Sequence, residues 1–142
     1  MIHNPEISNY SYSEQAFELI NKSLKDREHS SVFVLVDENT HNKCLPFFLQ
    51  NVPALKDYEL LEVEPGEESK SPEILVQLWQ VLSEFNADRH SLLINLGGGV
   101  ITDLGGFLAS TYMRGIRFVN FPTSMLAMAD ENRLYPLAML AN

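Results

Sequence analysis

Apolar residues in this chain fall into short, strand-length groups, separated by longer stretches in which they recur at helical spacing. Four groups predict strands, at residues 32–36, 58–63, 91–96 and 116–121. The first, VFVLV, is continuous and rich in β-branched residues, as a parallel strand covered on both faces should be. Because strand and helix patterns alternate from Val32 onward, the sequence predicts an α/β fold, a single domain with a Rossmann-like parallel sheet, right-handed crossovers and helices on both faces.

Two helices are predicted in the first third of the chain. Residues 1–12 show no clear period and are expected to form a loose or edge segment. Ser13 is expected to cap a helix that runs to about Arg27, because serine accepts a hydrogen bond from the first free N–H groups of a helix. Its inner face is expected to consist of Ala16, Phe17, Ile20 and Leu24. A second helix is expected over about residues 40–51.

The second half of the chain predicts two further helices. The sequence Ser71-Pro72-Glu73 is a strong helix start, because serine caps, proline suits the first turn and an acidic residue complements the dipole. This helix is expected to run to about residue 85, with an inner stripe of Ile74, Leu78, Leu82 and Phe85. The next helix follows residue 97 and has apolar residues at Ile101, Leu104, Leu108 and Tyr112.

Three consecutive glycines, Gly97, Gly98 and Gly99, join the third predicted strand to its helix. A strand, a glycine turn and a helix N-terminus can bind an anion, because free N–H groups and the helix dipole converge there. Glycine also lets a phosphate approach the backbone closely. The G-x-G-x-x-G fingerprint is not matched, since Thr102 stands where its third glycine would be. Spacing alone therefore leaves two interpretations open, a phosphate site and an ordinary strand-to-helix turn.

Polar residues also follow the first predicted strand. Asp37 and Asn39 come where ligands bind in open α/β sheets, outside the carboxyl ends of the strands. An acidic side chain there can accept hydrogen bonds from ribose hydroxyls. The alternative is that both residues only cap the next helix.

The turns after the second and fourth strands carry further candidates. Glu67 and Lys70 lie in a polar turn, where a solvated charge pair is the ordinary alternative to a ligand contact. Thr123 and Ser124 stand at the start of a short apolar helix. Hydroxyl groups at that position are usually caps, but they also lie where a ligand at the same sheet edge would receive a hydrogen bond.

Composition restricts the class of partner. The chain has 142 residues, enough for one domain, with 45% hydrophobic and 20% charged residues. Ten basic and nineteen acidic residues give a net charge of −9, which argues against nucleic acid or an anionic membrane as partner. A site for a phosphorylated ligand in such an acidic protein must supply its own local positive field.

Cysteine and histidine usage predicts a cytoplasmic protein without a metal site in this sequence. The single Cys44 permits no internal disulfide, and neither a signal peptide nor a bilayer-spanning run is expected. The four histidines show no paired ligand spacing and are expected on the surface or in loops, at His3, His29, His41 and His90.

Three separated motifs together resemble the 3-dehydroquinate synthase family. They are VDEN at 36–39, PGEESKS at 65–71 and GGGVITDLGGFLASTYMRGIRFVNFPTSMLAMAD at 97–130, so the resemblance spans roughly Phe33 to Asp130. It implies a lyase of the shikimate pathway that supports aromatic amino acid biosynthesis. The implied reaction converts 3-deoxy-D-arabino-heptulosonate 7-phosphate to 3-dehydroquinate and phosphate. NAD is the implied cofactor, with a divalent metal ion, zinc or cobalt, as Lewis acid.

The resemblance also implies roles for individual residues. Asp37 and Asn39 match positions on the adenosine side of the cofactor. Gly98, Gly99 and Val100 match the pyrophosphate cradle, and Asp103 matches a contact with the nicotinamide half. The remaining cofactor contacts match Glu67, Lys70, Thr123 and Ser124. The sugar-acid substrate is implied to contact Arg114 and Asp130, since an arginine fork suits phosphate or carboxylate.

The resemblance ends after Asp130. The family continues with a Gly-Gly pair and a lysine, whereas this chain has an atypical tail at 131–142 with Pro136 at the expected lysine. The family's C-terminal domain, with a glutamate and two histidines as metal ligands, is not found. We therefore expect this chain to be the NAD-binding N-terminal domain, inactive alone, with an exposed apolar patch that favours a homo-oligomer. Two alternatives remain: a stand-alone nucleotide-binding or interaction module without catalysis, and a remnant that binds nothing.

Overall fold

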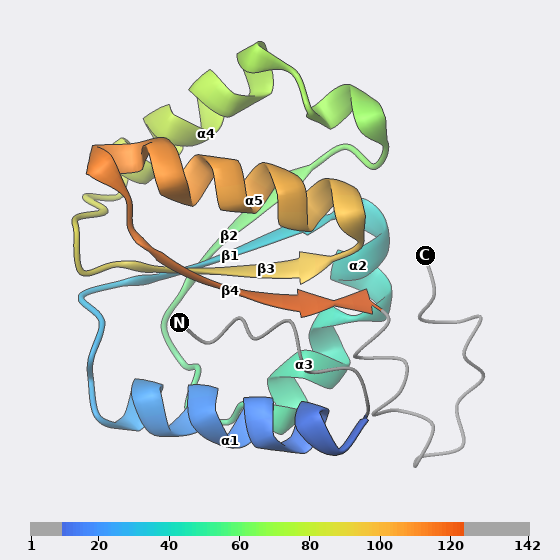
Figure 1. Ribbon diagram of the computed structural model, residues 1–142, viewed down its shortest axis with the longest axis vertical. Helices are drawn as coiled ribbons and strands as arrows, with labels where there is room; N and C mark the ends of the chain where they lie inside the picture. Colours follow the sequence, from blue (N-terminus) through green and yellow to red (C-terminus); the bar gives the residue numbers. More distant parts are fainter. Residues whose placement is uncertain (1–9, 124–142) are drawn as a thin grey trace.

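A sheet of four parallel strands lies at the centre of the structure, a computed structural model that describes residues 10–123 (Figure 1). The strands are β1 (Val32–Asp37), β2 (Glu59–Val63), β3 (Leu92–Gly97) and β4 (Arg117–Pro122). The helical elements are α1 (Tyr10–Lys25), α2 (Glu38–Lys43), α3 (Leu45–Asn51), η1 (Glu67–Ser69), α4 (Pro72–Glu84), α5 (Gly99–Thr111) and η2 (Tyr112–Arg114). The strand order is β2-β1-β3-β4. The predicted α/β class with a parallel sheet is confirmed.

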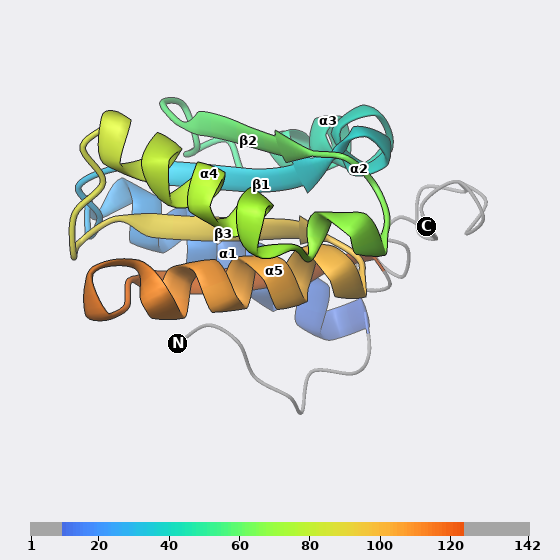
Figure 2. The ribbon, with the colours of Figure 1, turned by 90° about the horizontal axis from the view of Figure 1, so that it is seen from above.

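Helices cover both faces of the sheet. α1 and α3 pack on one face, and α4 and α5 lie side by side on the other (Figures 1 and 2). The residues of β1 alternate between the two cores: Val32, Val34 and Val36 belong to the first, and Phe33 and Leu35 to the second. This alternation explains why VFVLV has no polar position, since each face of the strand is buried.

The strand register brings the carboxyl ends of the strands to one edge of the sheet. Leu92 pairs with Arg117 at the start of β3 and β4, and Gly97 pairs with Pro122 at their ends. On the other side of β3, Val32 pairs with Leu92. The connections after all four strands therefore begin along the same edge, which we call the carboxyl edge.

Three predicted helix boundaries are wrong. α1 begins at Tyr10 rather than after Ser13. Residues 10–13 contain neither glycine nor proline, so nothing in their sequence excludes them from the helix. The helix predicted over 40–51 is two helices that meet at Cys44, because Pro46 in the first turn of α3 has no N–H to continue the first helix. α1 ends at Lys25, before Arg27, whose φ of 55° is left-handed.

The inner face of α4 also differs from the prediction. Leu75, Leu78 and Leu82 are buried, whereas Phe85 is 49% exposed. Phe85 is the C-cap of this helix, where the chain turns away from the core. Asn86 follows it at a φ of 60°, and the N–H of Ala87 donates to the carbonyl of Leu82 at 2.9 Å, as in a Schellman motif.

Candidate functional site

The glycine turn after β3 leaves the start of α5 open. Gly98 is the N-cap of this thirteen-residue helix, and no side chain caps it. The first free N–H groups and the positive end of the helix dipole therefore face the carboxyl edge without a side-chain partner. This is the geometry that the sequence predicted for an anion site.

The three glycines have different steric roles. A Cβ at Gly97 would come within 2.9 Å of Ile101, so this residue is needed for close packing of α5 on β3. A Cβ at Gly98 would be 4.0 Å from Thr123 Oγ1, and one at Gly99 would meet no atom within 4 Å. None of the three has a positive φ. Gly98 and Gly99 therefore leave free space beside exposed backbone, as a ligand that approaches the main chain requires.

Thr123 contributes a polar group to this space. It follows β4, it is 5% exposed, and its Oγ1 is buried without a hydrogen-bond partner among residues 10–123. A buried hydroxyl without a partner is unfavourable by about 1–3 kcal/mol. A ligand beside Gly98 would satisfy that hydroxyl. Ser124 and Asp130, also predicted as site residues, lie outside the described residues.

Asp37 caps α2, as one of the two interpretations of its position predicted. Its Oδ1 accepts a hydrogen bond from the N–H of Thr40 at 2.9 Å, and the N–H of Asp37 donates to Thr40 Oγ1 at 3.0 Å. This reciprocal capping box fixes the carboxylate at the end of β1. Asn39 lies in the first turn of α2 and is exposed.

Lys70 brings together two residues that are far apart in the sequence. Its Nζ lies 3.3 Å from Asp103 Oδ2 and 3.6 Å from Glu67 Oε1. The side chains of Lys70, Glu67 and Asp103 are 38%, 78% and 66% exposed. The hydrogen bond to Asp103 and the charge of Glu67 raise the pKa of Lys70 above its ordinary value. Three predicted cofactor residues thus form one cluster, in which the Glu67–Lys70 pair was one of two interpretations and the ion pair to Asp103 was not predicted.

Arg114 does not belong to this cluster. It lies in η2, after α5, where the chain has returned to the edge at which β4 begins. With a rise of about 1.5 Å per residue, α5 places it roughly 20 Å from the glycine turn. The resemblance implies for Arg114 a contact with the substrate rather than with the cofactor, and that contact stays a prediction.

An apolar groove of about 450 Å³ lies between α4 and α5 next to the ion-paired cluster. Sequence analysis did not predict it, because its apolar side chains come from two separate helices whose packing the sequence does not show. The groove is lined by Lys70, Ser71, Pro72, Leu75, Trp79, Asp103, Leu104 and Phe107.

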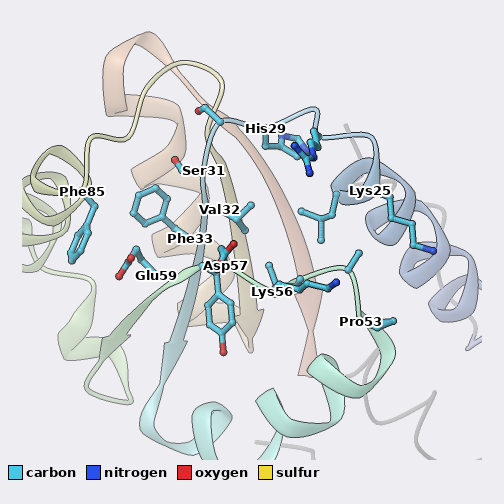
Figure 3. A pocket seen from close by; sticks show the side chains of 16 residues that line it. Lys25, His29, Ser31, Val32, Phe33, Pro53, Lys56, Asp57, Glu59 and Phe85 are labelled. Atoms are coloured by element: carbon cyan, nitrogen blue, oxygen red, sulfur yellow. The ribbon is translucent and has the colours of Figure 1, made fainter.

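A larger concavity, of about 960 Å³, lies at the opposite edge, beside the beginnings of β1 and β2 (Figure 3). Lys25, His29, Lys56, Asp57 and Glu59 are among its lining residues. None of the predicted site residues lines it. Its size alone does not make it the ligand site, because the open helix start and the hydroxyl of Thr123 lie at the carboxyl edge.

One buried polar pair supports the strands of the site. Asn95, in the middle of β3, donates from Nδ2 to Asn120 Oδ1 on β4 at 3.0 Å. Asn95 is fully buried, and its Oδ1 has no hydrogen-bond partner. Sequence analysis placed Asn95 in an apolar run and assigned it no function. The pair joins the two strands that end at Gly97 and Pro122.

Residues 10–123 contain neither a metal-binding cluster nor a membrane-spanning helix. No group of three or more His, Cys, Asp and Glu side chains is arranged to hold a metal ion. Within the same residues, no helix has both the length and the apolar character needed to cross a membrane.

The parallel sheet, the glycine turn and the open helix start at its carboxyl edge define an α/β protein of the Rossmann-like class. The family model for the N-terminal part of 3-dehydroquinate synthase matches residues 60–132, half of the chain. The chain therefore belongs to the 3-dehydroquinate synthase family. The match ends two residues beyond Asp130, where the resemblance in the sequence also ends.

Curated relatives support this membership. The 3-dehydroquinate synthase of Parabacteroides distasonis is 43% identical over 107 residues, which make up 75% of this chain and 30% of the relative. That of Clostridium botulinum is 40% identical over 119 residues, or 81% of this chain and 33% of the relative. The chain thus spans about a third of the length of these enzymes.

Solved structures share the fold. A 2-deoxy-scyllo-inosose synthase complexed with carbaglucose-6-phosphate, NAD⁺ and Co²⁺ matches with a TM-score of 0.66 at 20% identity, over 75% of this chain and 30% of that one. A 2-epi-5-epi-valiolone synthase from Streptomyces hygroscopicus, with NAD⁺ and Zn²⁺ bound, matches with a TM-score of 0.58 at 25% identity, over 71% of this chain and 29% of that one.

Proposed function

We propose that this chain, over residues 1–142, is the NAD-binding domain of a 3-dehydroquinate synthase. It would then take part in converting 3-deoxy-D-arabino-heptulosonate 7-phosphate to 3-dehydroquinate and phosphate. Family membership supports the activity. One observation supports the cofactor site above all others: the open turn at Gly98 and Gly99 lies beside the unpartnered, buried hydroxyl of Thr123. When bound, NAD supplies a hydride acceptor and, later, a hydride donor.

The start of α5 is the proposed position of the pyrophosphate. Backbone N–H groups of Gly98, Gly99 and Val100 would donate to phosphate oxygens, and the helix dipole favours the negative charge there. Thr123 would donate its hydroxyl to the same ligand, which gives this buried oxygen the hydrogen bond that it lacks among the described residues. Ser124 is the proposed neighbouring contact.

The remaining proposed contacts flank this position. Asp37 would accept hydrogen bonds from a ribose through Oδ2, since its Oδ1 caps α2 and no hydrogen bond from residues 10–123 reaches Oδ2. Asn39, beside it in the first turn of α2, is the second proposed contact on the adenosine side. Glu67, Lys70 and Asp103 are proposed cofactor contacts on the other flank, where their cluster lies near the start of α5.

The family resemblance also implies residues that contact the substrate and a metal ion. Asp130 is proposed to contact the sugar-acid substrate. Arg114 is likewise proposed to contact this substrate, although α5 separates it from the glycine turn. The family resemblance implies zinc or cobalt, but no metal-binding cluster among the described residues fits such an ion, and no step is assigned to one.

Calorimetric titration of NAD into the chain tests the cofactor site. Gly99→Val should abolish binding without disturbing the fold, because a side chain there meets no protein atom and the backbone φ is unstrained. Gly106→Ala is the matched control in the same helix, since its Cβ would be an ordinary 3.8 Å from Phe118. Absence of heat with the unaltered chain at millimolar NAD would contradict the proposal.

The alternative function is nucleotide binding without catalysis. The open turn is present in residues 10–123, whereas a metal-ligating cluster is not found there, and this favours testing the alternative directly. That the 142-residue chain alone has no synthase activity stays a prediction. Formation of 3-dehydroquinate by the purified chain with NAD, metal ion and substrate would contradict it.

A further inference from the structure

The concavity beside the beginnings of β1 and β2 is lined by more cations than carboxylates. Its charged lining residues are Lys25, Arg27 and Lys56 against Asp57 and Glu59, whereas the whole chain has ten basic and nineteen acidic residues. All five are exposed, and none of them forms an ion pair within residues 10–123. The charges of this lining are therefore not neutralised by contacts within the described part of the chain.

Arg27 occupies its place in this lining with an unfavourable backbone conformation. It follows α1 with a φ of 55°, in the left-handed region where glycine is preferred because a Cβ is disfavoured. Residues held in such conformations are concentrated at functional sites, where the side chain compensates for the strain. The guanidinium group of Arg27 gives the concavity a planar set of donors for a phosphate or a carboxylate.

The concavity has a cationic end and an aromatic end. Lys25 and Arg27 come from the end of α1, on one face of the sheet, and Phe85 closes α4 on the other face. Figure 3 shows Phe85 and Glu59 on one side and Lys25 and His29 on the opposite side. Phe85 is 49% exposed, so much of its ring is open to contact. The concavity thus crosses the edge of the sheet from cations to an aromatic ring.

We propose that this concavity is a second binding site, for a small compound that carries one phosphate or carboxylate group on an aromatic ring. The anionic group would lie against Arg27 and Lys56, and the ring against Phe85. Asp57 and Glu59 would repel a second anionic group, so a ligand with a single one is favoured. The volume of about 960 Å³ suits a small molecule. This site lies at the edge opposite the proposed NAD site and does not depend on it.

Two substitutions of Arg27 separate binding from folding. Arg27→Gly and Arg27→Ala both remove the guanidinium group and should raise the Kd for phenyl phosphate about three- to fivefold, as expected for an exposed ion pair. Only the glycine variant should also gain stability, so its loss of affinity cannot come from unfolding. Phe85→Ser should raise the Kd for phenyl phosphate about two- to tenfold and leave that for inorganic phosphate unchanged. Lys43→Gln is the matched control, because it removes one exposed positive charge from α2.

The experiment is an NMR titration of the amide groups of each protein with phenyl phosphate, inorganic phosphate and pyrophosphate. Shift changes at residues 24–31 and 53–59 report the concavity, and those at residues 97–99 report the glycine turn. Phenyl phosphate should bind the concavity more tightly than the other two anions, and both Arg27 variants, but not Lys43→Gln, should weaken it. No saturable shift at the concavity, tighter binding of pyrophosphate there, or equal weakening by Lys43→Gln would overturn the inference. Failure of NAD to bind would contradict only the proposed function.

Discussion

The amide of Asn95 occupies the space directly against Gly105 of α5. A Cβ built at Gly105 would overlap the Asn95 side chain, which is fully buried and cannot swing into solvent. The same amide donates to Asn120 on β4. The side chain of Asn95 thus sets how closely α5 approaches β3, and it also links β3 to β4. The glycine turn joins β3 to α5, and Thr123 follows β4, so this one side chain helps to position both.

Gly105→Ala should therefore destabilise the protein by about 1–3 kcal/mol, because the added methyl group overpacks a buried contact. The free energy of urea unfolding measures this effect. Gly106→Ala, next to it in the same helix, meets only Phe118 at 3.8 Å and should be neutral or stabilising. The double variant Asn95→Ala/Gly105→Ala should recover part of the loss. Equal stability of the two single alanine variants would contradict the contact.

A glycine at position 27 should stabilise the protein. Arg27 follows α1 with a φ of 55°, and its N–H donates to the carbonyl of Leu24 at 3.2 Å, as at the left-handed position of a Schellman motif. Arg27→Gly should raise the free energy of unfolding by about 0.5–1 kcal/mol, because glycine adopts this conformation without a Cβ penalty. Arg27→Ala keeps that penalty and serves as control. A gain with alanine equal to that with glycine would show that backbone strain is not the cause.

The stability of the protein should depend on pH through His29. Partial burial and, next, the charge of Arg117 lower the pKa of His29, although Glu28 acts in the opposite direction. Its Nε2 lies 2.6 Å from Ser23 Oγ. Because the folded state binds the proton less readily than the unfolded state, protonation favours unfolding. This contribution to stability is present above the ordinary value of about 6.5 and is lost as the pH falls below it.

His29→Gln removes this proton while keeping a group that can bond to Ser23. Urea unfolding at several pH values between about 5 and 8 should show the unaltered chain losing stability relative to this variant as the pH decreases. A constant difference between the two proteins over that range would rule out His29 as the source.

Phe107 should mediate self-association through the α4–α5 face. It is 57% exposed and lines the apolar groove together with Leu75 and Trp79. A side chain that projects beside a groove on the same surface allows a two-fold pairing, in which each copy fills the groove of the other. Sedimentation velocity should show an association that increases with concentration and that Phe107→Ser abolishes. Sedimentation of the unaltered chain as a monomer at all concentrations would contradict it.

Local sequence rules predicted the elements better than their ends. The apolar run of β1 and the serine cap of α4 depend on neighbouring residues, and both were predicted correctly. The break at Cys44 was missed although Pro46, in the first turn of α3, signals it. The left-handed Arg27 was missed because arginine carries no turn signal.

The site was predictable only where its residues follow strands directly. The parallel sheet necessarily gathers Asp37, Gly98 and Thr123 at one edge. The ion pair from Lys70 to Asp103 depends instead on how α4 and α5 pack, and no motif spacing contains that information. The buried Asn95 was likewise invisible, since its partners come from another strand and from the adjacent helix.

The strand order has a consequence for synthesis on the ribosome. β1 pairs with β2 and with β3, but β4 pairs only with β3, so the strand that precedes Thr123 is the last to join the sheet. Pairing between distant segments is slow and must wait until both have left the ribosome. A nascent chain can thus bury both faces of β1 before the proposed ligand site exists. A ligand at the proposed site would therefore stabilise the finished domain but could not assist the earlier steps of its folding.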